Sequence, residues 1–372
     1  MHFVKPTRWN SPLKAVIIGT MELKKRKKVV AWLIIGAVVL FLGLLFEFFR
    51  HRYQVNRNVI FTTEGSKLQL FRDKKQDDFY IKGLLLRPGE AGTTRAEYAA
   101  WIRRAASLNV NVIQVHDVHP PAFYQAFFEY NLFTDRPVYL LHGIWLDDAV
   151  TESYQNAYDD RYIAEFFEEI RRVIDTVHGK ASNDQGKYNF NASPYIMGYV
   201  LCEPPEPGFI TFTIEQNAHV IGFEGDYIYT VNASPFEAWL AAMGNYAVSY
   251  EKDRYGGTSR LVSWTSRTDI SPVIRVEDHA EVDFEHINAT EKFNAGIFAS
   301  YRVLPDEPRL RALEVYYSMP VVLMEWNVPA TGVAEVFEEI VRARIGGGVI
   351  FSIPEDHLQE FYAIIRQQFA DH

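Results

Sequence analysis

Two acidic residues follow long apolar segments of this chain. Glu203 comes after YIMGYVL (195–201), and Glu325 closes the segment PVVLME (320–325). Hydrolysis of a glycosidic bond with retention needs such a pair: a carboxylic acid that protonates the leaving oxygen, and a carboxylate about 5–5.5 Å away that attacks the anomeric carbon. Glu206 lies three residues after Glu203 and is a candidate for the same role. The alternative for each acid is a helix N-cap or a partner for a nearby Arg.

Further polar and aromatic residues stand where other apolar segments end. Aromatic rings suit stacking on the flat faces of sugars, and polar side chains suit the recognition of hydroxyl groups. The candidate substrate-binding residues are His116, His142, Trp145, Glu206, Trp264, Tyr301, Arg302 and Trp326.

The sequence offers little for other chemistries. His116, Asp117 and His119 form a weak metal-ligand pattern, for which sugar recognition or structural hydrogen bonding is the competing interpretation, and we predict no metal site. The one cysteine, Cys202, has no neighbouring base and excludes a disulfide framework. A G-x-S-x-G nucleophile motif is missing, and the two-carboxylate mechanism requires no cofactor.

An alternation of strand-like and helical segments must position these residues. Apolar segments that predict strands lie at 79–86, 110–117, 137–143, 195–201, 260–266, 294–304, 320–325 and 347–353. Helical segments are expected at 95–108, 121–131, 160–178, 236–252, 308–317, 333–345 and 355–369. The strands are continuous apolar runs, as in parallel strands buried on both faces.

Eight such units predict an α/β fold, a closed (β/α)8 TIM barrel. An open doubly wound sheet is the alternative, but no Gly-rich turn follows its first strand to receive a dinucleotide. A β-hairpin around Glu64-Gly65-Ser66 is expected before the barrel. Because active sites of these barrels lie at the C-terminal strand ends, Glu203 and Glu325 should face each other across the barrel mouth.

The N-terminal region predicts a membrane anchor. Residues 29–49 are a 21-residue apolar segment whose single charged residue is Glu47. As a helix this segment would be about 31 Å long, enough to cross the hydrocarbon core of a bilayer. Five basic residues, 24–28, precede this segment. By the positive-inside rule, residues 1–28 lie in the cytoplasm and 50–372 form an extracytoplasmic domain. A cleaved signal peptide and a buried core helix are the alternatives.

The charge distribution argues against nucleic acid as a partner. Residues 1–52 hold ten Lys or Arg and two acids, a balance of +8. Since the whole chain carries −9, residues 53–372 carry −17. A domain this acidic lacks the basic stripe that grips phosphate backbones.

Several segments resemble clan-A glycoside hydrolases, the cellulase-like and glucanosyltransferase-like (β/α)8 enzymes. FYIKGLLL (79–86) resembles their "F-x-I-K-G-V" first strand, and RAASLNVNVIQVHDV (104–118) resembles their second unit. PVVLMEWNVP (320–329) is similar to their "P-V-x-x-x-E-F-G" seventh strand, whose Glu is the nucleophile. The resemblance therefore implies that role for Glu325.

A narrower resemblance is to membrane-associated bacterial barrels of this kind. It rests on VDFEHINA (282–289), GIFASYRVLPDEP (296–308) and PVVLMEWNVPATG (320–332). The chain departs from the enzymes at Cys202, where their fourth strand has Asn before Glu, and at Arg302, where the narrower group has His. Its eighth strand ends in residues 353–357, IPEDH, in place of an aromatic-acid cluster.

The sequence thus predicts a membrane-anchored, extracytoplasmic glycoside hydrolase or transglycosylase that acts on a β-glucan or exopolysaccharide. Glu325 is the expected nucleophile and Glu203 the expected acid/base, whose pKa its surroundings must raise. The alternative is a catalytically inactive barrel that binds polysaccharide or serves a membrane glycosyltransferase or export complex as an accessory subunit. The eroded strand-end motifs fit that alternative.

Overall fold

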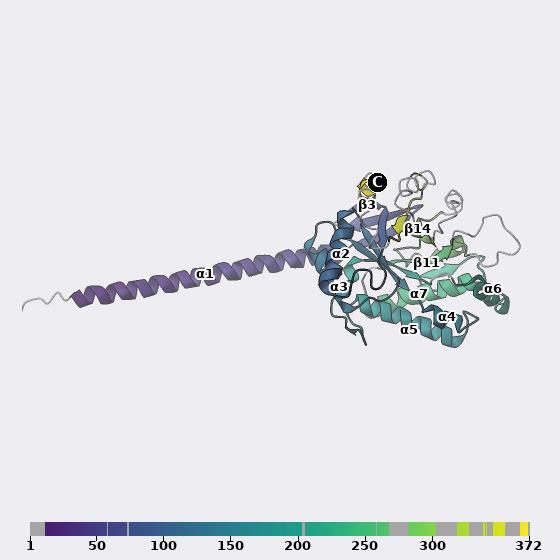
Figure 1. The fold of residues 1–372 in the computed structure, drawn as a ribbon, viewed down its shortest axis with the longest axis horizontal. Coiled ribbons are helices and arrows are strands. Elements are labelled where there is room, and N and C mark those ends of the chain that lie inside the picture. Colours follow the sequence, from purple (N-terminus) through teal and green to yellow (C-terminus); the bar gives the residue numbers. More distant parts are fainter. Residues whose placement is uncertain are drawn as a thin grey trace, which may run out of the picture. The chain divides into compact units, whose positions relative to one another are not determined.

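The computed structural model describes residues 12–57, 59–72, 74–202, 205–257, 259–267, 282–302, 318–326, 338, 340, 345–353 and 365–370. The chain divides into two compact units, Met1–Gln54 and Val55–His372. The first is dominated by one helix and the second by a barrel (Figure 1).

Helix α1 (Pro12–Arg57) contains the predicted apolar segment. Its stretch Arg26–His51 is 26 residues long, strongly apolar and exposed. The helix is long and apolar enough to cross a membrane, as the sequence predicted, and a signal sequence near an N-terminus has the same properties.

Eight parallel strands of the second unit close into a barrel, which confirms the predicted TIM barrel and excludes the open sheet. In the order in which they pair, the strands are β11 (Leu261–Arg267), β13 (Ala299–Arg302), β14 (Val321–Trp326), β15 (Gly348–Phe351), β4 (Ile81–Leu85), β5 (Val112–Val115), β6 (Tyr139–Ile144) and β9 (Ile196–Leu201). Their burial is nearly complete, as the continuous apolar runs required.

Four helices form where the periodicity predicted them: α2 (Arg95–Ser107), α3 (Pro121–Phe133), α5 (Asp160–Val177) and α7 (Pro235–Tyr255). Capping boxes start α2 at Thr94 with Glu97 and α7 at Ser234 with Glu237. Two further helices, α4 (Asp148–Glu152) and α6 (Pro207–Gln216), were not predicted. Residues 365–370 are helical, whereas the predicted helix 308–317, most of 333–345 and 355–364 lie outside the described residues.

A small antiparallel sheet packs at the N-terminal end of the barrel. It comprises β1 (Ile60–Glu64), β2 (Lys67–Arg72) and β3 (Lys75–Phe79), so the predicted hairpin has gained a third strand. The Phe61 ring lies 4.8 Å from the ring of Tyr139, the first residue of β6. A Cβ on Gly346 would lie 2.2 Å from the Ser66 carbonyl oxygen, so only glycine fits there.

Loops carry the remaining short elements. Strands β7 (Ser182–Asn183) and β8 (Gly186–Lys187) form a hairpin, and β10 (Ile228–Thr230) pairs with β12 (Ile287–Ala289). The 3₁₀ turns η1 (Ser193–Tyr195) and η2 (Phe284–His286) precede β9 and β12.

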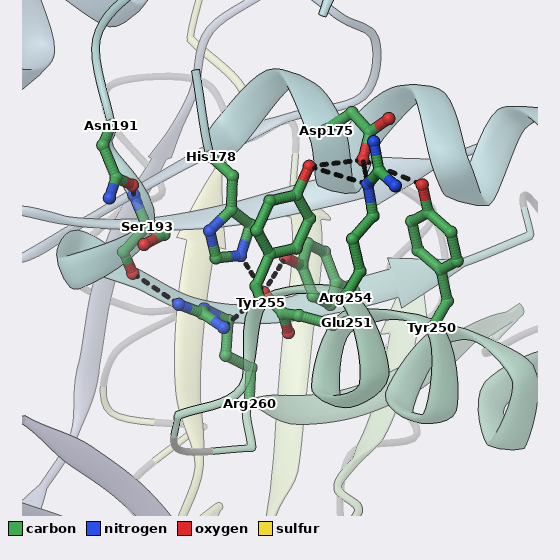
Figure 2. Close-up of polar contacts among 10 residues, drawn as sticks. Asp175, His178, Asn191, Ser193, Tyr250, Glu251, Arg254, Tyr255 and Arg260 are labelled. Atoms are coloured by element: carbon green, nitrogen blue, oxygen red, sulfur yellow. Dashed lines mark hydrogen bonds and ion pairs between the residues drawn. The ribbon is translucent and has the colours of Figure 1, made fainter. Parts of the chain in front are cut away.

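A buried ionic network ties α5 and α7 to the barrel near the N-terminal ends of β9 and β11 (Figure 2). The Glu251 carboxylate on α7 accepts hydrogen bonds from His178 Nε2 at 2.7 Å, from the Tyr199 hydroxyl at 2.9 Å and from the Arg260 guanidinium. Arg260 also donates to the Ser193 carbonyl at 2.8 Å. Burial raises the pKa of Glu251, but Arg260 and His178 outweigh that effect and hold it below its usual range.

Tyr255, Tyr250 and Asp175 form a second layer of contacts on this network. The His178 ring lies parallel to the Tyr255 ring, with centroids 3.8 Å apart. The Tyr255 and Tyr250 hydroxyls both donate to Oδ1 of Asp175, at 2.6 and 2.9 Å (Figure 2). Burial lowers the pKa of His178, and the hydrogen bond to Glu251 only partly offsets that effect.

Candidate active site

The two-residue alternation of the strands decides which side chains enter the barrel. Gln114 on β5 and Met324 on β14 touch, with Nε2 3.7 Å from Sδ, although these strands are not neighbours in the barrel. Both side chains therefore point into its interior. The hydroxyls of Ser263 and Ser300 meet at 3.1 Å on adjacent strands.

His116 and Arg302 continue these inward-facing rows toward the C-terminal end. His116 lies two residues after Gln114, and Arg302 two residues after Ser300. Because side chains on one face of a strand recur every second residue, both side chains share the inner face. The C-terminal ends of β5 and β13 thus send a histidine and an arginine toward the barrel mouth.

Glu325 breaks the alternation on β14. It directly follows the inward-facing Met324, so a regular strand would turn its side chain outward. Instead, Glu325 has φ of +56°, and the pairing of β14 with β15 shifts register between Leu323 and Trp326. A non-glycine residue at positive φ is uncommon and costs free energy unless its surroundings hold it there. The irregularity turns the carboxylate toward His116 and Arg302.

The side chains of His116 and Arg302 contact the Glu325 carboxylate, and Glu325 is only 5% exposed. Nε2 of His116 lies 2.8 Å from Oε1, and Nε of Arg302 lies 3.1 Å from Oε2. Burial alone would raise the pKa of Glu325, but His116, Arg302 and the nearby Arg87 together lower it. The carboxylate is therefore ionised at neutral pH, as a nucleophile must be.

Arg87 is a site residue that the sequence analysis missed. Its Nη2 donates to Oγ of Ser352 at 2.5 Å, and its Nη1 lies 3.4 Å from Oε1 of Glu90. Arg87 directly follows the strand-like segment 79–86, and that position was the signal available in the sequence.

Trp145 packs against His116. The two ring centroids are 3.9 Å apart, and the indole Nε1 donates to the Val200 carbonyl of β9 at 3.1 Å. Trp145 is 6% exposed. The structure thus brings His116, Trp145, Arg302 and Glu325 together, and with Arg87 they form what we call the Glu325 cluster.

Three predicted site residues face the surrounding layer of helices and loops instead. Nε2 of the buried His142 lies 2.8 Å from the Tyr124 hydroxyl on α3, while Nδ1 donates to the Gly143 carbonyl at 2.6 Å. The Trp264 indole packs so closely on α7 that a Cβ at Gly244 would lie 2.5 Å from it.

The third is Tyr301, whose ring packs edge-on against Phe284 at 5.6 Å. It adjoins the inward-facing Arg302, so the strand alternation turns it outward. We therefore correct the sequence interpretation of His142, Trp264 and Tyr301: they are core residues between the barrel and its surrounding layer.

The remaining candidates are placed only in part. Glu206 is exposed and directly precedes α6. Glu203 and the side chain of Trp326 lie outside the described residues, and Cys202, just before Glu203, has φ of +65°. In the described part of the chain, no three His, Cys, Asp or Glu side chains are grouped as metal ligands.

The buried histidines predict a loss of stability in acid. Burial lowers the pKa of His142 to about 3 and that of His119 to about 4, against 6.5 for a free side chain. Below pH 6.5 the unfolded chain therefore binds protons that the folded chain does not, and stability falls as the pH falls. Each histidine should cost about 1.4 kcal/mol per pH unit, or about 2 kcal/mol between pH 6.5 and 5.

Denaturant unfolding at a series of pH values measures this slope. His142→Gln should reduce the slope by about one proton, whereas His219→Gln, at an exposed position, should leave it unchanged. An unchanged slope in His142→Gln would show that this ring does not stay neutral in the folded protein.

Comparison with known proteins places the fold. Neither a protein-family model nor a curated protein matches the sequence. Among solved structures, an endo-1,4-β-mannanase from Rhizomucor miehei superposes with a TM-score of 0.52 at 12% identity, over 84% of this chain and 100% of that one. Saccharomyces cerevisiae Gas2p, in complex with laminaritetraose and laminaripentaose, gives 0.50 at 14% identity, over 84% of this chain and 68% of that one. At these identities the likeness establishes the fold, a (β/α)8 barrel shared with glycoside hydrolases.

Proposed function

We propose that this chain is a membrane-anchored glycoside hydrolase or transglycosylase that acts on a β-linked glucan or exopolysaccharide. The observation that carries the proposal is the Glu325 carboxylate. It is buried at the C-terminal end of β14, turned into the barrel mouth by an unusual backbone conformation, and kept ionised by His116 and Arg302. A strained, buried and ionised carboxylate at this end of a TIM barrel is typical of a catalytic group.

In this proposal Glu325 attacks the anomeric carbon and forms a glycosyl-enzyme intermediate. Glu203, two residues after β9 in the sequence, protonates the leaving oxygen and then activates the water or sugar hydroxyl that completes the reaction. The fold likeness to a β-mannanase and to a protein holding laminari-oligosaccharides supports a glycan substrate. The test is turnover of β-linked glucan and mannan oligosaccharides by the full chain, and its loss in Glu325→Gln.

A second candidate function is a catalytically inactive barrel that binds polysaccharide, alone or beside a membrane glycosyltransferase or export complex. The observation that favours it is Cys202, which stands where the similar enzymes have the Asn of their Asn-Glu pair. Polysaccharide binding without turnover on any substrate would support this candidate over the enzyme.

We also propose that α1 anchors the chain with its barrel outside the cytoplasm. The apolar segment of α1 and the basic residues 24–28 before it support this orientation. Alkaline phosphatase, which is active only outside the cytoplasm, should be active when fused after His372 and inactive when fused after Lys28. An inactive fusion at His372, with the full-length protein present, would reverse the orientation and remove an exopolysaccharide from the possible substrates.

A further inference from the structure

We propose that His116 and Trp145 are positioning residues for Glu325, and that neither binds sugar directly. This inference rests on the proposed function, because it assigns these two side chains a role in the reaction of the same site. It replaces the sugar-binding role that the sequence suggested for both residues.

The His116 side chain is oriented toward Glu325. Nε2 of His116 is buried and lies 2.8 Å from Oε1 of Glu325. A histidine that recognises sugar hydroxyls must present a ring nitrogen to the substrate. Here the buried Nε2 faces the Glu325 carboxylate, so this contact serves Glu325.

Trp145 holds the histidine in this orientation. Its indole packs on the imidazole with centroids 3.9 Å apart and planes tilted by 35°. The indole N–H is used by the Val200 carbonyl, and 6% exposure leaves almost no face for a sugar ring. The backbone of β6 must approach closely to allow this packing, since a Cβ on Gly143 would lie 2.4 Å from the His116 carbonyl oxygen.

These contacts form a chain across the barrel mouth. It runs from Val200, three residues before Glu203, through Trp145 and His116 to Glu325. The end of β9, which leads to the proposed acid/base, is thereby linked to the proposed nucleophile. Glu325 has a strained backbone at φ +56°, and such a conformation persists only where surrounding contacts over-determine it.

The charged groups around Glu325 give His116 a measurable signature. In the described part of the site these groups are His116 from the end of β5, Arg302 from β13 and Arg87 after β4. Arginine side chains in proteins stay charged, whereas histidine side chains can lose their proton in the accessible pH range. Removing His116 should therefore raise the pKa of Glu325 and reduce the carboxylate fraction at low pH.

The experiment compares His116→Gln and Trp145→Phe with the exposed control His219→Gln in the full-length protein in detergent. His116→Gln should lower kcat about 10- to 100-fold, as expected for a misplaced reacting group, with KM changed less than about twofold. The acid limb of kcat/KM should move to higher pH, because Glu325 must be ionised to react. Trp145→Phe should lower kcat and move the acid limb of kcat/KM in the same directions as His116→Gln, but by less. The reason is that Phe keeps the ring contact with His116 and loses only the hydrogen bond to Val200. A rise in KM with kcat unchanged in either variant would restore the sugar-binding role and overturn the inference.

An infrared titration separates this inference from the proposed function. The carboxylic-acid band that is lost in Glu325→Gln reports the protonation of Glu325 without any turnover. If the wild type is inactive on every substrate but His116→Gln raises the midpoint of this band, the positioning contact holds and the enzymatic proposal fails. An unchanged midpoint in His116→Gln overturns the positioning role whether or not the protein is an enzyme.

Discussion

Glu325→Gln is expected to lower turnover by at least about 10³-fold while glycan binding survives. The substitution keeps the size of the side chain and removes the negative charge that attacks the anomeric carbon. Losses of this size or larger are typical when a nucleophile is removed, because the step it performs has no substitute in the site. The measurement is release of reducing ends from β-linked glucan and mannan oligosaccharides by the full chain.

Glu215→Gln is the matched control, because this acid is exposed on α6 and undergoes the same change of charge. It should retain wild-type turnover. A Glu325→Gln variant with wild-type turnover would place the chemistry elsewhere in the barrel.

Glu325→Ala extends this result by opening space beside His116 and Arg302. Azide can then occupy the position of the lost carboxylate, held by His116 and Arg302, and attack the anomeric carbon as the leaving oxygen departs. The product is a glycosyl azide of inverted configuration, whereas the wild type retains configuration. Azide rescue would identify Glu325 as the nucleophile, and loss of activity without rescue would make it a structural acid.

The barrel could be predicted from the sequence because its strands are continuous apolar segments. YIMGYVL (195–201), for example, contains no charged residue, as expected of a parallel strand that is buried on both faces. The third strand of the small sheet, β3, could not be found in this way. Its sequence KQDDF is polar and mostly exposed, and only its pairing with β2 makes it a strand.

The candidate site was harder to predict because position along a strand does not reveal direction. Tyr301 and Arg302 are adjacent, so the two-residue alternation admits one of them to the barrel interior. His142 and Trp264 also lie on barrel strands, but their side chains point outward. His142 contacts Tyr124 on α3, and Trp264 packs against Gly244 on α7. A strict alternation would have excluded Glu325 as well, since it adjoins the inward-facing Met324. The positive φ of Glu325 turns its side chain inward. That backbone conformation depends on the tertiary contacts of β14, so it could not be predicted from the sequence.

Arg260→Gln should cause a large loss of stability. It would leave the Glu251 carboxylate buried without its arginine partner, and breaking a buried ion pair in this way costs about 3–5 kcal/mol. The bond from Arg260 to the Ser193 carbonyl would also be lost. Denaturant or thermal unfolding of the full-length protein measures the change. Arg161→Gln, at the exposed pair with Asp159, is the matched control and should change stability by less than about 1 kcal/mol.

A double variant shows whether the cost comes from the unpaired charge. In Glu251→Leu with Arg260→Met, neither charge remains to be buried, so the loss of stability should be smaller than the sum of the losses in the two single variants.

The sign of the pH dependence gives a second check. Arg260 is one of the groups that lower the pKa of Glu251, so removing Arg260 should raise that pKa. Acid should then neutralise the carboxylate more readily and narrow the stability gap between Arg260→Gln and the wild type. Because the network lies near the N-terminal strand ends, away from Glu325, the variants that remain folded should keep the turnover of the wild type. Additive losses in the double variant would mean that the Glu251–Arg260 contact contributes packing and little charge pairing.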